Sequence, residues 1–65
     1  MGKLSTEEIE IAGRAAHDAY YEEGYQAGRN LADILEKQMI LSGSTSSDHI
    51  YAFEKATGYS YRGKR

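Results

Sequence analysis

The sequence predicts an all-α protein with one long amphipathic helix, one short helix and a basic C-terminal tail. Three observations support this fold class. Apolar residues recur with helical spacing from Thr6 to Leu41, the chain contains no proline, and a serine-rich stretch with a glycine follows residue 41. Proline is the residue that most strongly interrupts a helix, so a proline-free segment with this period is typical of one.

The long helix is expected to begin at Thr6. Ser5 or Thr6 can cap its first turn, and Glu8 stands three residues after Ser5, as in a capping box. No stop signal follows until the segment LSGSTSS, in which Gly43 favours the left-handed position just after a helix. The predicted helix covers residues 6–41 and would be about 54 Å long at about 1.5 Å per residue.

A second, short helix is expected over residues 47–57. Ser46 or Ser47 would cap its start, and Gly58 would end it. The remaining residues, 59–65, form a basic tail that is either flexible or lies extended against another part of the structure.

The long helix has an apolar side and a solvated side. At about 100° per residue, its apolar residues fall in one stripe of ordinary width. The residues of this stripe are Ile9, Ala12, Ala16, Tyr20, Ala27, Leu31 and Ile34. The residues expected on the solvated side are Asp18, Glu22, Arg29, Asp33 and Glu36.

Two glycines four residues apart, Gly24 and Gly28, interrupt this helix. Together with Gly13 they cost about 2.5–3 kcal/mol relative to alanine, which is much of the stability of a small domain. We therefore expect either a close helix contact or a hinge near Gly24–Gly28. A break there would give a helical hairpin. A continuous helix cannot build a core alone and needs a second chain. We predict association of continuous helices rather than a break into a hairpin.

The predicted homo-oligomer would use the row of small residues that recurs every four positions along the helix. Rows of this kind pack into the grooves of a neighbouring helix and let the two backbones approach closely. The residues predicted to lie in this interface are Ala12, Ala16, Tyr20, Gly24, Gly28, Leu31 and Leu35.

Tyrosine and arginine side chains are predicted to bind a partner or ligand. Both residue types are enriched at binding hot spots, and aromatic rings can also stack on nucleic-acid bases. The alternative interpretation is that the tyrosines cover the alanines as part of the core. The predicted binding residues are Arg14, Tyr21, Tyr25, Arg29, Tyr59, Tyr61 and Arg62.

The net charge of −2 is unevenly distributed. All ten acidic residues lie between Glu7 and Glu54, whereas three of the eight basic residues lie in the last four positions. The chain up to Tyr61 therefore carries −5, with five basic against ten acidic residues. An acidic body disfavours a broad phosphate-binding surface and suits a basic partner.

Several classes of protein are not expected. The chain has no cysteine for a disulfide or thiolate metal site, and no apolar run approaches the about 20 residues of a membrane span. His17 and His49 belong to no metal-ligand spacing, and no catalytic or phosphate-binding motif is present. We expect a single cytoplasmic domain, residues 1–65, without cofactor, metal or enzymatic activity.

The expected function is a self-associating helical module that binds and modulates a protein partner. Small acidic helical chains without cysteine resemble, as a class, the inhibitors that phages encode against host or defence proteins, which implies a viral inhibitor. One alternative is an oligomer that binds or sequesters a nucleotide or small ligand at a Tyr/Arg site between chains. Another is a nucleic-acid-associated protein that acts through the basic tail.

Overall fold

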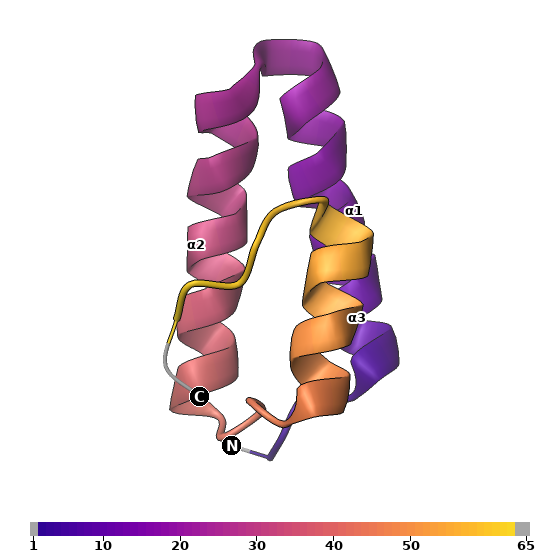
Figure 1. Cartoon of the computed structure of the whole chain (residues 1–65), viewed down its shortest axis with the longest axis vertical. Helices are drawn as coiled ribbons and strands as arrows, with labels where there is room; N and C mark the ends of the chain where they lie inside the picture. The colour runs from indigo at the N-terminus through magenta and orange to yellow at the C-terminus, as the bar shows by residue number, and fades with distance from the viewer. Residues whose placement is uncertain (1, 64–65) are drawn as a thin grey trace.

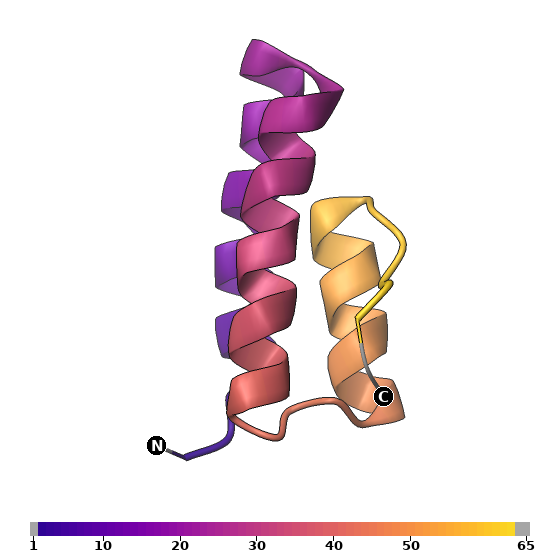
Figure 2. The same ribbon diagram turned by 90° about the vertical axis from the view of Figure 1, so that its left-hand side faces the viewer.

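The computed structural model describes residues 2–63 and contains three helices in this part of the chain (Figure 1). Helix α1 spans Thr6–Glu23, α2 spans Tyr25–Leu41 and α3 spans Ser47–Thr57. α1 and α2 form an antiparallel hairpin, and α3 packs against α1. The segment after α3 crosses back to α2 on the same side of the hairpin (Figure 2). The predicted all-α class and the short helix are thereby confirmed.

The predicted long helix is two helices, because it breaks at Gly24. The backbone there has φ +101° and ψ 179°, a combination that is essentially restricted to glycine. The Gly24 N–H still closes the last turn of α1 by donating to the Tyr20 carbonyl at 2.9 Å, and α2 begins at the next residue. The hairpin gives each long helix a packing partner within one chain, so the fold does not require a second chain.

The ends of the helices follow the predicted signals. Ser5 accepts from the Glu8 N–H at 3.1 Å, and the Glu8 carboxylate accepts from the Ser5 N–H at 2.8 Å. Ser46 caps α3, where His49 takes the place of the acidic partner. The Nε2 of His49 also donates to the Leu4 carbonyl at 2.9 Å, because a carbonyl can only accept. His49 therefore ties the N-terminal segment to α3.

The core lies between the three helices and the C-terminal segment. Phe53 of α3 is fully buried, and the ring of Tyr61 meets it edge-on at a centroid distance of 5.6 Å. The buried apolar cluster consists of Ile9, Ala16, Ala32, Leu35, Met39, Ile50, Ala52, Phe53, Tyr59 and Tyr61. Two of these residues come from the predicted tail, so the segment up to residue 63 is part of the fold.

The row of small residues allows close packing, and it does so within one chain. A Cβ atom on Gly28 would lie 2.9 Å from the Ala16 carbonyl oxygen and 2.9 Å from the Tyr20 Cβ, which is closer than real contacts. A Cβ atom on Gly13 would lie 2.7 Å from the Ala56 Cβ. Glycine therefore lets α2 and α3 approach α1.

The sequence predicts that no segment spans a membrane. Between residues 2 and 63, none of them combines the length and the hydrophobicity that crossing a bilayer requires.

The hinge gives a first prediction. Replacing Gly24 with alanine should lower the free energy of unfolding by about 1–3 kcal/mol, because an L side chain is strained in this backbone conformation. Urea denaturation measures the change. Gly2→Ala is the control: Gly2 has no positive φ and has open space where the methyl group would lie, so its variant should stay within about 0.5 kcal/mol of the wild type. Equal stability of the two variants would show that Gly24 does not hold the turn.

Candidate functional site

Arg29 is only 3% exposed and fastens the C-terminal segment to α2. Its Nε donates to Asp33 at 2.9 Å, its Nη2 to Glu36 at 2.8 Å, and its Nη1 to the Ser60 carbonyl at 3.0 Å. The guanidinium carbon also lies 5.1 Å from the centre of the Tyr59 ring. Burial by itself would lower the pKa of Arg29, but the hydrogen bond to Asp33 and the charge of Glu36 raise it. The charge of Arg29 is thus neutralised by Asp33 and Glu36, and its role is structural.

The position of Arg29 corrects the predicted solvated side of the long helix. Arg29 and Glu36 were expected in water, yet both are buried. The C-terminal segment covers them, and the Arg62 N–H adds a 2.9 Å hydrogen bond to Glu36. Helical periodicity alone cannot reveal a cover that comes from 31 residues further along the chain.

Three predicted binding residues lie on this C-terminal segment. Tyr59 and Tyr61 are buried, and the Tyr61 N–H donates to Glu54 at 2.8 Å. The Arg62 side chain is exposed and pairs with Asp33 at 3.3 Å. The segment is therefore packed and bonded up to this point. The last two basic residues of the predicted tail, Lys64 and Arg65, lie outside the described residues.

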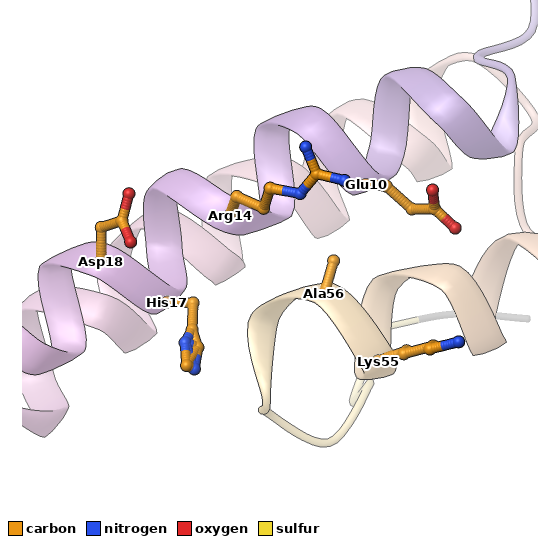
Figure 3. A pocket seen from close by; sticks show the side chains of 6 residues that line it. All are labelled: Glu10, Arg14, His17, Asp18, Lys55 and Ala56. Carbon is orange, nitrogen blue, oxygen red and sulfur yellow. The ribbon is translucent and has the colours of Figure 1, made fainter.

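A groove of about 450 Å³ separates part of α1 from the C-terminal half of α3 (Figure 3). The predicted binding residue Arg14 borders it and extends along α1 towards Glu10, while His17 projects towards α3. The lining residues are Glu10, Arg14, His17, Asp18, Lys55 and Ala56. Two acidic and two basic side chains balance each other here, so the groove has no single sign of charge to attract a phosphate.

A second pocket, of about 330 Å³, adjoins the groove and shares His17 with it. We call it the tyrosine pocket. Its lining residues are His17, Tyr20, Tyr25, Thr57, Gly58 and Tyr59. The Tyr59 ring is perpendicular to that of Tyr20 (89°, centroids 6.2 Å apart) and tilted by 59° from that of Tyr25 (5.1 Å). The three rings therefore form walls rather than a stack.

The hinge explains why these tyrosines meet. Tyr20 lies in the last turn of α1 and Tyr25 begins α2, so the reversal at Gly24 places both beside Tyr59. The Tyr59 hydroxyl donates to the Tyr25 carbonyl at 2.7 Å, which fixes the ring at the base of the pocket. Tyr21 stays outside, highly exposed, with its ring 4.9 Å from that of His17.

Sequence reasoning found part of this pocket and missed part. Tyr25 and Tyr59 were predicted as binding residues and do line it, whereas Tyr20 was assigned to the oligomer interface. His17 was not predicted. Its spacing of four residues from Tyr21 on one helix was the available signal, because side chains at that spacing are neighbours.

The side of the α1–α2 hairpin that faces away from α3 forms a separate surface, the open face. On α2 it carries Leu31, Ile34 and Leu41, which are 40%, 54% and 73% exposed. At about 100° per residue these side chains lie on the opposite side of α2 from Arg29 and Glu36, which contact the C-terminal segment. The facing flank of α1 carries three alanines, Ala12, Ala15 and Ala19.

The residues predicted for an oligomer interface are divided between the interior and the surface. Ala16, Gly28 and Leu35 are buried within the single chain, and Gly24 forms the hinge. Ala12 and Leu31 are exposed on the open face, while Tyr20 borders the tyrosine pocket. A second chain could therefore contact only part of the predicted row.

Other proteins and metal chemistry offer no guide to these surfaces. Among residues 2–63, no three histidine, aspartate or glutamate side chains lie close enough together to hold a metal ion. No family model matches the chain, and no curated protein or solved structure is significantly similar to it. The surfaces must be interpreted from their own chemistry.

The buried ion pair gives a second prediction. Arg29→Met should lower the free energy of unfolding by about 3 kcal/mol, because it leaves the buried Glu36 carboxylate without its guanidinium. Adding Glu36→Leu should restore part of this loss, because it removes the unpaired carboxylate, although the Ser60 carbonyl and the Arg62 N–H still lack their partners on α2. Chemical denaturation of the single and double variants measures both effects. A double variant no more stable than Arg29→Met would contradict the assignment.

Tyr59 gives a third prediction. Burial raises its pKa above the ordinary value of 10.0, and Tyr25 and Tyr20 add to the increase. The folded state therefore holds the phenol proton more tightly than the unfolded chain, and the resulting stabilisation is complete below pH 10.0 and lost as the pH rises through the higher folded pKa. The Tm of the wild type should fall more steeply above pH 10.0 than that of Tyr59→Phe.

The comparison for Tyr59 concerns the slope of Tm against pH, because Tyr59→Phe also loses the hydrogen bond to the Tyr25 carbonyl at every pH. Tyr51→Phe serves as the control, since Tyr51 lies exposed on α3 and should leave the slope as in the wild type. Parallel slopes for all three proteins would show that Tyr59 ionises alike in the folded and unfolded states.

Proposed function

We propose that this chain is a small helical interaction module that self-associates through the open face and binds a protein partner. The observation that carries this proposal is the exposure of Leu31, Ile34 and Leu41 on α2. Helical geometry places them on the side of the hairpin opposite α3, and Figure 2 shows that α3 and the C-terminal segment both lie on the other side. Contiguous apolar side chains on the surface of a small protein mark interaction sites. A second copy of the chain offers the same surface and is the occupant proposed here.

The open face is suited to pairing with itself. Large aliphatic side chains lie along α2, and small alanine side chains lie along the neighbouring flank of α1. In a two-fold dimer each patch meets the same patch on its partner. In the proposed dimer the aliphatic side chains on α2 of each chain would lie on the alanine flank of the other. Small alanine side chains would let the two helices come close, and of the predicted row of small residues Ala12 lies on this flank.

The size of the face bounds the strength of this dimer. The chain extends over 31 × 19 Å along its two longer axes, which corresponds to a projected area of roughly 600 Å² for one face. Stable interfaces usually bury about 800 Å² per partner. The proposed dimer is accordingly weak, with dissociation in the micromolar range.

The tyrosine end of the molecule supports binding of a protein partner. Tyr20, Tyr21 and Tyr25 are exposed there, and tyrosine is a residue type that dominates binding energy at protein interfaces. The acidic body, −5 up to Tyr61, favours a basic partner. The narrower expectation of a phage-type inhibitor stays a prediction.

The two alternative functions have less support. A nucleotide site was expected to use Arg29, but its guanidinium is paired with Glu36 and Asp33 inside the chain. Nucleic-acid contact through the basic tail would use Arg62, which is exposed and pairs with Asp33 at 3.3 Å, together with Lys64 and Arg65, which lie outside the described residues. Both alternatives stay predictions, and we do not develop them into proposals.

The association model gives a fourth prediction. Ile34→Glu should weaken self-association at least about tenfold, because a charged side chain replaces apolar area that the dimer buries. Sedimentation equilibrium across the micromolar range measures the dissociation constant of the wild type and of the variant. The melting temperature of the dilute variant should stay that of the dilute wild type, since Ile34 is half exposed in one chain.

Tyr51→Glu is the control. Tyr51 is also large and is 66% exposed, but it lies on α3, on the opposite side of the hairpin from the open face. This variant should associate like the wild type. A wild type that remains monomeric throughout, or a Tyr51 variant as impaired as the Ile34 variant, would rule out association through the open face.

A further inference from the structure

We infer that the tyrosine pocket binds the cationic side chain of an arginine or lysine from a basic segment of the protein partner. The inference rests on the proposed function in taking the partner to be a protein. It concerns a different surface from the open face: the pocket lies where the hinge end of the hairpin meets the end of α3. The two surfaces can therefore be tested separately.

The walls of the pocket suit a cation. Aromatic rings carry negative charge on their faces, and a cation within about 6 Å of a ring centre is attracted to it. The Tyr59 ring at the base is nearly perpendicular to that of Tyr20 and tilted by 59° from that of Tyr25. Groups of aromatic rings arranged around a cavity are a recurrent way to hold ammonium groups.

The pocket is also preorganised at its base and open at its rim. The hydrogen bond to the Tyr25 carbonyl and burial hold Tyr59 in place, whereas the rings of Tyr20 and Tyr25 are about half exposed. Because Tyr59 is already ordered in the free protein, a ligand does not have to order it, and the entropic cost of binding is lower. The volume of about 330 Å³ is at the low end for ligand pockets and suits one side chain.

The charges around the pocket favour a cation over an anion. None of the six lining residues is lysine or arginine. The last turn of α1 contains no basic residue, and Asp18 borders the adjoining groove. Arg29 lies over Tyr59, but Asp33 and Glu36 neutralise it.

The helix dipoles also favour a cation on balance. The C-terminal ends of α1, at Glu23, and of α3, at Thr57, carry partial negative charge near the pocket, whereas only α2 begins there with a partial positive charge. The groove beside the pocket is balanced in charge and would not repel a basic segment running on from the bound side chain.

The test uses the wild-type chain and two short peptides that differ only in charge. The first is acetyl-Gly-Arg-Gly-amide, and the second carries citrulline, the neutral isostere of arginine, in its place. NMR titration follows the ring protons of the tyrosines. We expect the arginine peptide to shift the signals of Tyr20, Tyr25 and Tyr59 with saturation at millimolar concentration. The citrulline peptide should shift them little.

A variant pair adds a second measurement. Tyr25→Leu should weaken binding of the arginine peptide about two- to fivefold, the effect of one exposed cation–π contact. Tyr25 is exposed and contributes only its backbone carbonyl to the hydrogen bond with Tyr59, so the variant keeps that bond. Tyr51→Leu, which alters an exposed tyrosine on α3, should bind like the wild type.

Three results would overturn the inference. The first is equal shifts with arginine and citrulline, which would show that charge is not recognised. The second is a Tyr25→Leu variant that binds like the wild type. The third is adenosine monophosphate shifting these rings while the arginine peptide does not, which would assign the pocket to an anionic aromatic ligand. Running the titration on Ile34→Glu separates this inference from self-association, because loss of the dimer should leave peptide binding intact.

Discussion

The reversal of the chain at Gly24 is the constraint on which the rest of the structure depends. Only glycine readily holds that backbone conformation, and from it follow the pairing of α1 with α2 and the close approach at Gly28. A helix of this composition forfeits intrinsic stability at each glycine. The loss is offset because the same residues let three short elements bury one core. The glycines thus lower the intrinsic stability of the helices but allow the helices to pack closely.

A chain this small must recruit every segment into its core, and Arg29 shows how this is done. Domains of about 60 residues bury only about 60% of the surface of the unfolded chain. Here an extended C-terminal segment supplies the missing layer, with Tyr59 and Tyr61 as its buried side chains. Its backbone carbonyls and N–H groups need partners away from water, and Arg29 and Glu36 provide them from α2. The buried ion pair therefore holds in place an extended segment that covers the core where a fourth helix would otherwise be needed.

Local features of the fold could be predicted from sequence, and non-local ones could not. The capping box at Ser5 and the stop at Gly58 are short-range signals, and the structure contains both. The choice between a continuous helix and a hairpin depends on what packs against the alanines, which the sequence of one helix does not specify. Arg29 was placed in solvent for the same reason: its partners at Ser60 and Arg62 belong to a segment whose path only the tertiary fold determines. The tyrosine pocket shares this origin, since Tyr25 and Tyr59 meet across 34 residues.

The positions of the two proposed surfaces bear on how a weak binder can act. The open face lies opposite α3, whereas the tyrosine pocket is bounded by α3 itself, so pairing through the first leaves the second accessible. A two-fold dimer would present two such pockets. A single cation–π contact contributes little affinity, but two linked contacts turn the second binding step into an intramolecular one, and the combined affinity rises steeply. Such a dimer would select partners that display two basic segments at matching separation. Self-association would then supply the affinity and specificity that one small pocket lacks.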